Sequence, residues 1–280
     1  MDPIVERRLP AEGLRDVVET IWVQEEDSPA SRTPSCVVPT GTIEILFHYG
    51  DRFSHVENGQ ANLVPRCYVT GQRTVPVFTL APERVGIVIA SLYPWGLVGL
   101  FPECTETPDG YVDLELLVGR DPVAEVVEQL QAATDLDHRI RLVESFLLQH
   151  RGDFLQRDRI IDSCRWLANG AAGYPVAVAA ERAGMSRRHY GRLFRSTIGT
   201  SPKTFSRIMR FQRATSLRRG SRLSWAAIAA ECGFVDQAHL AKEIKHFSAR
   251  TAGEIDLQYD EADNFFNGNA VSKFFNTVYL

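Results

Sequence analysis

Apolar residues recur at three- and four-residue intervals through most of the C-terminal part of the chain, between about residues 158 and 255. This period places apolar side chains on one stripe of a helix, so the pattern predicts a helical region. We expect one helix from about 158 to 169, ended by Gly170 to Gly173, and a longer one from Ser201-Pro202 to Arg219. The longer helix joins two segments that resemble each other.

Both segments follow one short order of residues: a small alanine, a glycine four positions later, and then a polar residue that precedes another apolar stripe. Alanine lets two helices approach closely, glycine supplies the positive φ of a tight turn, and the polar residue can cap the next helix. The pattern therefore predicts two helix-turn-helix units. Their key residues are Ala180, Gly184 and Ser186 in the first, and Ala229, Gly233 and Asp236 in the second.

The helix that follows each glycine is expected to dock in a DNA major groove, where long polar and basic side chains reach base edges and phosphates. The base-contacting candidates are Arg187, Arg188, Arg192, Gln237, His239 and Lys242. The phosphate-contacting candidates are Ser186, Arg195, Lys203, Arg207 and Lys245. A solvated charged face is the other interpretation of the same residues.

The runs GMSRRHYGRLFRSTIGTSPKTF and GFVDQAHLAKEIKHFSARTAGEI, with the helix between them, resemble the DNA-binding domain of AraC/XylS transcriptional regulators. The resemblance covers about 100 residues, and both units match in order and spacing. It implies two helix-turn-helix units, held by a linker helix, that read successive major-groove segments. It also implies double-stranded DNA as a partner, with RNA polymerase and a second copy of the chain as further expected partners.

Charge separates this region from the rest of the chain. Residues 151 to 255 carry 19 Lys and Arg against 8 Asp and Glu, a net charge of +11. Residues 1 to 150 carry 11 against 23, a net charge of −12, and the tail from 256 to 280 carries −3. One basic region between acidic flanks indicates a single nucleic-acid site. We therefore predict a DNA-binding domain over 155 to 255, an N-terminal domain over 1 to 150 and a tail over 256 to 280.

The N-terminal part contains short runs rich in β-branched and aromatic residues, at 36–39, 42–50, 67–71, 75–80 and 85–94. Their length and spacing predict an antiparallel sandwich or barrel. The opening at 11–26 is either helical or extended. A DLELL run with helical spacing, a helix beginning at Asp121-Pro122 and another beginning at Asp135 or Asp137 are expected to close the domain. They either dimerise it or cover its sheet. The fold class is thus α+β, with a β-rich domain followed by an all-α domain.

The segments PTGTIEILFHYG, TGQRTVPVF and LYPWGLVGLF are similar to β-rich sensor domains that precede such DNA-binding units in bacterial regulators. This similarity implies a small-molecule effector, for which apolar and aromatic side chains commonly line the site. The candidates for a pocket are Trp22, Phe47, Tyr49, Tyr68, Tyr93 and Trp95. These aromatics would equally serve as core, and a regulator without an effector, controlled by dimerisation or by cysteine oxidation, is the alternative.

Five dispersed cysteines, without a CxxC pair, favour a reducing cytoplasm over a disulfide framework. The sequence MDPIVERRLP lacks the apolar stretch of a signal peptide, and no run approaches the ~18 apolar residues of a membrane helix. No GxSxG, GxGxxG, P-loop or HExxH pattern occurs, so neither enzymatic catalysis nor a cofactor or metal is expected. A cytoplasmic regulator remains the prediction, with an architectural DNA-binding protein as the competing class.

Overall fold

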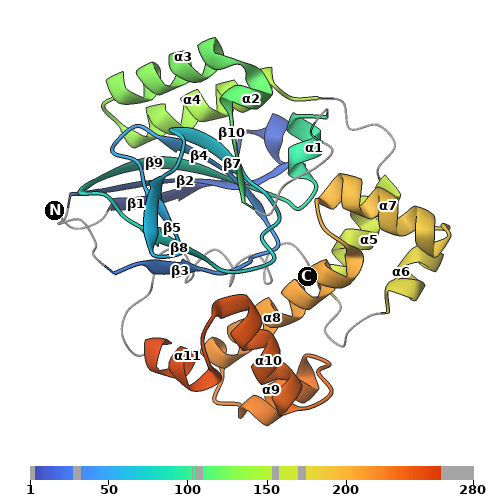
Figure 1. Ribbon diagram of the computed structural model, residues 1–280. Helices are drawn as coiled ribbons and strands as arrows, with labels where there is room; N and C mark the ends of the chain where they lie inside the picture. Colours follow the sequence, from blue (N-terminus) through green and yellow to red (C-terminus); the bar gives the residue numbers. More distant parts are fainter. Residues whose placement is uncertain are drawn as a thin grey trace. The chain divides into compact units, whose positions relative to one another are not determined.

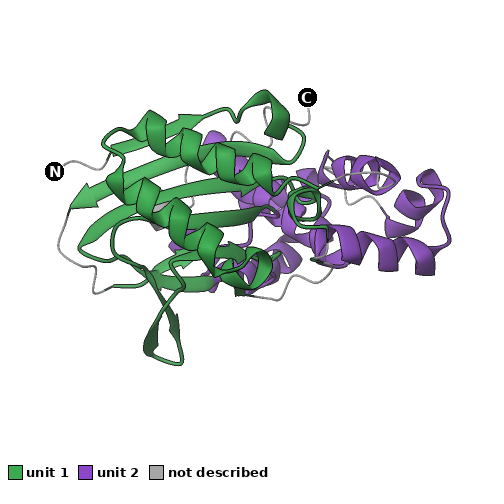
Figure 2. Ribbon diagram, turned by 90° about the horizontal axis from the view of Figure 1, so that it is seen from above, with its two compact units in different colours: residues 1–36, 42–72, 77–155 green, residues 37–41, 73–76, 156–280 purple. Residues whose placement is uncertain are grey.

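The computed structural model describes residues 4–27, 33–102, 104, 110–152, 158–169 and 175–259. The chain forms two units, shown in green and purple in Figure 2. The first unit consists of residues 1–36, 42–72 and 77–155, and the second of 37–41, 73–76 and 156–280. The expected helix end at Gly170 to Gly173 and most of the tail lie outside the described residues.

A six-stranded sheet forms the centre of the first unit, with the strand order β1-β2-β9-β4-β7-β10. Neighbouring strands pair antiparallel. The strands are β1 (Ile4–Arg8), β2 (Val18–Asp27), β4 (Ile43–His48), β7 (Cys67–Thr70), β9 (Arg84–Leu92) and β10 (Tyr111–Asp113). The segment 11–26, which was predicted to be either helical or extended, is a short 3₁₀ turn, η1 (Glu12–Leu14), followed by the long strand β2.

Two helices, α3 (Arg120–Ala132) and α4 (Leu136–Gln149), lie over one face of this sheet (Figure 1). Their buried apolar side chains form one core with the alternate strand residues Ile43, Ile45 and Phe47. The Asp135 carboxylate caps α4 by accepting from the backbone N–H of His138 at 2.7 Å. This settles the choice between Asp135 and Asp137. The helices α1 (Gly96–Leu100) and α2 (Glu115–Val118) complete the unit, and α2 is the helix that the DLELL run predicts.

Four more strands form a second sheet in the order β3-β8-β5-β6. They are β3 (Ser35–Val37), β5 (Ser54–Glu57), β6 (Gln60–Leu63) and β8 (Val77–Leu80). His55 of β5 packs edge-on against Tyr68 of β7, with ring centroids 6.2 Å apart, so side chains of the two sheets contact each other. Within the described part of the chain the strands form two separate sheets, which makes the architecture a sandwich.

The second unit contains α5 (Asp158–Asn169), α6 (Val176–Arg182), α7 (Arg187–Ile198), α8 (Pro202–Gly220), α9 (Trp225–Glu231), α10 (Gln237–Ser248) and α11 (Ala252–Tyr259). The predicted long helix is α8. Ser201 caps it by accepting from the Thr204 backbone N–H at 3.1 Å, and Pro202 occupies its first position. Both choices favour initiation, since the first turn leaves backbone donors unsatisfied and proline has none to lose. The predicted α+β fold class is confirmed.

Candidate nucleic-acid interface

The two turns predicted from the repeated pattern have the same backbone geometry. Gly184 has φ +67° and Gly233 has φ +69°, in the left-handed region that other residues adopt only at a cost. The residue after each glycine donates a backbone hydrogen bond to the buried alanine of its unit. These bonds join Met185 N to Ala180 O at 3.0 Å and Phe234 N to Ala229 O at 2.9 Å. The helix-turn-helix prediction for both units is confirmed at the level of backbone geometry.

Each turn is followed by a capped helix. The Ser186 hydroxyl accepts from the His189 backbone N–H at 3.3 Å, and the Asp236 carboxylate accepts from the His239 N–H at 2.6 Å. Ser186 was predicted to contact phosphate. Its side chain is exposed, but its oxygen already serves α7 as the N-cap. A phosphate contact from Ser186 stays a prediction.

The helix α7 has an apolar face and a basic face. Tyr190 and Phe194 are fully buried, and the Tyr190 hydroxyl lies 2.8 Å from the Ser163 hydroxyl of α5, which holds α7 on the unit. Four arginines are exposed on α7: Arg187, Arg188, Arg192 and Arg195. Arg192 Nη2 lies 3.3 Å from His189 Nδ1 on the same exposed surface. The geometry leaves these guanidinium groups accessible to a polyanion.

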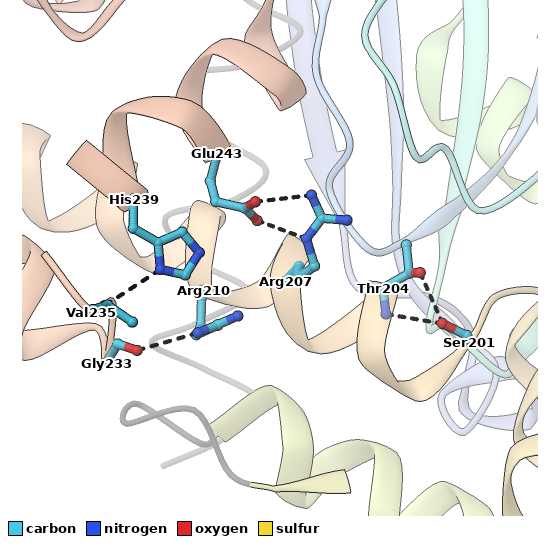
Figure 3. Close-up of polar contacts among 8 residues, drawn as sticks. All are labelled: Ser201, Thr204, Arg207, Arg210, Gly233, Val235, His239 and Glu243. Carbon is cyan, nitrogen blue, oxygen red and sulfur yellow. Dashed lines mark hydrogen bonds and ion pairs between the residues drawn. The ribbon is translucent and has the colours of Figure 1, made fainter. Parts of the chain in front are cut away.

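The corresponding helix of the second helix-turn-helix unit, α10, exposes Gln237, Lys242 and Lys245. His239 is only half-exposed, because its ring lies edge-on to Phe234 at a centroid distance of 5.4 Å. Its Nδ1 accepts from the backbone N–H of Val235 at 3.4 Å (Figure 3). A neutral His239 in this arrangement carries its proton on Nε2 and presents a donor, the group that purine N7 or guanine O6 would accept from.

Val235 is a further candidate that sequence patterns did not identify. It is 87% exposed and lies immediately before the capping residue of α10, while its neighbour Phe234 is buried. In the first helix-turn-helix unit the cap Ser186 follows Met185 directly, whereas in the second helix-turn-helix unit Val235 is inserted between Phe234 and Asp236. This inserted residue is the sequence feature that could have identified Val235. An exposed valine at the start of a reading helix suits contact with a thymine methyl group.

The linker helix α8 was predicted to offer Lys203 and Arg207 to phosphates. Lys203 is exposed. Arg207 instead points to Glu243 of α10, and its Nε and Nη2 donate to the two carboxylate oxygens at 2.9 Å each (Figure 3). With its hydrogen-bonding edge occupied by a carboxylate, Arg207 is poorly suited to bind a phosphate. The structure therefore favours an internal role for this residue.

The six aromatic residues proposed for an effector pocket do not lie together. Trp22 and Tyr68 are buried on the face of the six-stranded sheet opposite to Phe47, which packs against Phe146 of α4 at 5.5 Å. The Tyr49 ring lies under the Arg139 guanidinium at 4.2 Å. Tyr93 and Trp95 stack on each other at 5.0 Å after the end of β9. The period-two alternation of strands separates Trp22 and Tyr68 from Phe47.

Polar side chains lie beside Trp22 and Tyr68 on the face of the six-stranded sheet that contacts the second sheet, here called the inner face. The Trp22 indole N–H donates to the Ser91 hydroxyl at 3.3 Å. His48 is fully buried, stacks on Tyr68 at 5.8 Å, and its Nδ1 lies 2.9 Å from the Arg66 carbonyl. Burial lowers the pKa of His48 to about 4, so its imidazole is neutral at pH 7. This face combines aromatic surface with neutral hydrogen-bonding groups.

The buried cysteines do not favour control by oxidation. Cys36 and Cys67 are buried, and burial raises the pKa of the Cys67 thiol to about 12. The reactive form is the thiolate, which is therefore scarce at Cys67 near neutral pH. In the described ranges no three His, Cys, Asp or Glu side chains gather as metal ligands, and no helix there is long and apolar enough to cross a bilayer.

Solved structures similar to this chain include two of ToxT from Vibrio cholerae. The structure from strain O395 is 10% identical with a TM-score of 0.46 and covers 93% of this chain and 98% of its own. The structure from strain SCE256, with an unsaturated fatty acid bound, is 11% identical with a TM-score of 0.47 and covers 84% and 94%. The AraC-like activator CuxR gives 14% and 0.29, covering 72% and 84%. Similarity at this level carries no argument about this chain's ligand.

Family models match parts of both units, and one curated protein matches a shorter stretch. An uncharacterised HTH-type transcriptional regulator of Haemophilus influenzae is 41% identical over 68 residues, which make up 24% of this chain and 23% of that protein. Residues 6–113 match a domain of unknown function, DUF6597, and residues 179–256 match a family of helix-turn-helix domains. Together with the two equivalent turns and the linker helix between them, the family match identifies residues 179–256 as a helix-turn-helix domain with two such units.

Proposed function

We propose that this chain is a cytoplasmic, sequence-specific DNA-binding transcription regulator of the AraC type. The observation that carries the proposal is the repetition of one helix-turn-helix geometry, each copy followed by a capped helix with an exposed polar and basic face. Two such helices joined by α8 suit successive major-groove segments about one helical turn apart. We assign DNA binding to residues 155–255, which carry most of the positive charge.

We further propose that residues 1–150 bind a small molecule that controls DNA binding. Support comes from the inner face of the sandwich, where Trp22, His48 and Tyr68 are buried beside hydroxyl groups. Apolar walls with a few fixed polar groups are typical of small-molecule sites. Dimerisation through α3 and α4 is the alternative means of control. Their apolar stripes are covered by the sheet, which favours the effector.

The DNA-binding proposal is tested by selecting bound sequences from random DNA with the full-length protein. We expect an asymmetric motif of two short blocks about one helical turn, ~10 base pairs, apart. Affinity for it should fall steeply with salt, by a factor of about 10³ to 10⁵ between 50 and 200 mM if six to ten phosphates are neutralised. Repeating the selection with residues 151–280 separates a requirement for effector from non-specific binding. No enriched motif with either protein would contradict sequence-specific recognition.

Val235 supplies a prediction about one base in the second block. If its side chain packs on a thymine methyl, replacing that thymine by deoxyuridine should weaken binding by about 0.8 kcal/mol, or roughly fourfold. The same replacement should have no effect on a Val235→Ser variant, because the methyl then has no apolar partner. The measurement is a fluorescence anisotropy titration with each thymine of the selected motif replaced in turn.

Ala238, also exposed at the start of α10, provides the matched control for this experiment. Ala238→Ser should leave the response to deoxyuridine at the Val235 position unchanged. Equal responses of the parent and Val235→Ser at every thymine would rule out the assigned contact.

A further inference from the structure

Arg207 and Glu243 form a two-pronged ion pair between the linker helix and the second reading helix. Both contacts are 2.9 Å long, and the side chains are only 29% and 10% exposed. A guanidinium and a carboxylate joined by two parallel hydrogen bonds fix each other's orientation as well as their distance. The Arg207 guanidinium also lies 5.2 Å from the ring centroid of Phe247, another α10 residue. The pair therefore defines the angle at which α10 lies on α8.

Two further arginines on the same side of α8 contact the rest of the second helix-turn-helix unit. Arg210 Nη1 donates to the Gly233 carbonyl in the turn at 3.2 Å, and its guanidinium lies 5.2 Å from the Phe234 ring centroid (Figure 3). Arg213 Nη2 lies 3.2 Å from the Glu231 carboxylate at the end of α9. Spaced three residues apart, these side chains share one helix face. Together with Arg207, they connect α8 to α9, to α10 and to the turn between these two helices.

We propose that Arg207 and Glu243 are positioning residues that set the orientation of α10 on α8, and thereby the spacing of the two base blocks that the protein accepts. The inference rests on the proposed DNA-reading function. It assigns specificity to a pair that contacts no base. It also removes Arg207 from the phosphate contacts, because Glu243 already occupies both donors on that edge of the guanidinium.

Apolar packing holds α10 on α8 independently of this pair. The Phe211 ring of α8 lies 5.3 Å from the Phe247 ring of α10, and both side chains are buried. Such packing favours association but constrains the angle less sharply than two directional hydrogen bonds. Loss of the ion pair should therefore loosen the angle while the unit stays folded. That separation makes the proposal testable by DNA binding.

The test uses the full-length protein and DNA duplexes in which the two selected blocks are separated by the preferred spacing or by one base pair more or less. The variants are Glu243→Gln, which removes the charge and keeps the shape, and Arg207→Lys, which keeps the charge and removes the fork. We expect the parent to discriminate against the altered spacings by about tenfold, which corresponds to ~1.4 kcal/mol. Both variants should reduce this discrimination to roughly threefold or less. Their circular dichroism should match that of the parent.

Salt dependence separates positioning from phosphate contact. Lys245 is exposed on α10, so Lys245→Gln is the matched control. It should lower the slope of log affinity against log salt by about 0.9 and leave the spacing preference unchanged. Arg207→Gln should flatten the spacing preference and keep the parent slope. If Arg207→Gln instead lowers the slope as Lys245→Gln does, while Glu243→Gln binds every spacing like the parent, Arg207 is a phosphate contact and the proposal is overturned.

The remaining outcomes also decide the question. Should Glu243→Gln fail to fold, Glu243→Asp and Arg207→Lys, which retain charge, carry the test with the same expectations. If the parent itself selects no two-block motif, the proposed function fails together with this inference. If the parent selects the motif but Arg207→Lys and Glu243→Asp discriminate spacings as it does, only the positioning role fails.

Discussion

Replacing Arg139 with alanine is expected to lower the free energy of unfolding of the N-terminal unit by about 3 kcal/mol, as for other buried ion pairs that lose one partner. Arg139 is 11% exposed and donates to the Glu25 carboxylate at 2.5 Å. It also donates to the carbonyls of Leu130 and Ala133, at 3.1 and 2.6 Å. One side chain thus joins β2, α4 and the C-terminal end of α3.

Those carbonyls explain the size of the expected effect. They belong to the last turn of α3 and to the residue after it, where the last backbone acceptors of a helix lack partners within the helix. Alanine would leave them, and the Glu25 carboxylate, without this donor in a largely buried site. The measurement is urea denaturation followed by circular dichroism. Arg139→Lys should recover part of the lost stability, because lysine keeps the positive charge but has fewer hydrogen-bond donors.

Arg84 provides the control for this prediction. Its guanidinium donates to both carboxylate oxygens of Asp51, at 3.0 and 3.1 Å, but the pair is exposed. Water competes for both partners, so Arg84→Ala should leave the denaturation midpoint close to that of the parent. If Arg84→Ala and Arg139→Ala shifted the midpoint equally, burial would not be the source of the Arg139 contribution.

Arg192→Ala is expected to weaken binding to the selected DNA by about 1–3 kcal/mol, roughly 5- to 150-fold, and to relax the preference at one base. Arg192 is exposed on α7, opposite to the buried Phe194. Arginine can donate two hydrogen bonds to guanine O6 and N7, and a wrong base leaves those donors unsatisfied. The measurement is the ratio of affinities for the selected and a scrambled duplex at fixed salt. Arg188→Ala should behave in the same way at a different base.

Arg195, one turn further along α7, gives the comparison for base reading. It is predicted to contact phosphate, so Arg195→Ala should weaken binding to both duplexes alike and lower the salt slope by about 0.9. An Arg192→Ala variant that kept the parent's ratio of selected to scrambled binding would show that Arg192 does not read a base.

Short-range patterns predicted much of the second unit. The helix over 158–169, the positive φ at Gly184 and Gly233, and the caps at Ser186 and Asp236 depend on residues within one or two turns of each other. The same holds for the buried stripe of α3 and the cap of α4. The linker helix was predicted to end at Arg219, one residue before its end at Gly220. Propensity and capping act locally, so a single sequence contains the information.

Strands that depend on partners were harder to predict. The chain segments of β1, β5 and β6 read IVERR, SHVE and QANL, with weak apolar alternation and much polar surface. β1 and β5 become strands because backbone groups of more distant segments, β2 and β8, pair with them, whereas β6 pairs with β5 across the two-residue turn Asn58-Gly59. A strand has no internal hydrogen bonds, so its formation depends on a partner that local sequence does not reveal.

The amino-acid sequence alone determined that this chain has a β-rich part, a basic helical part and two helix-turn-helix units with exposed arginines on α7. Only the tertiary structure decided that Trp22 and Phe47 lie on opposite faces of the sheet, and that Arg207 binds Glu243 while Lys203 stays exposed. Lys203 and Arg207 on α8 carry the same charge in the same helical pattern. Their roles diverge because α10 brings the Glu243 carboxylate to Arg207, whereas Lys203 stays exposed to water.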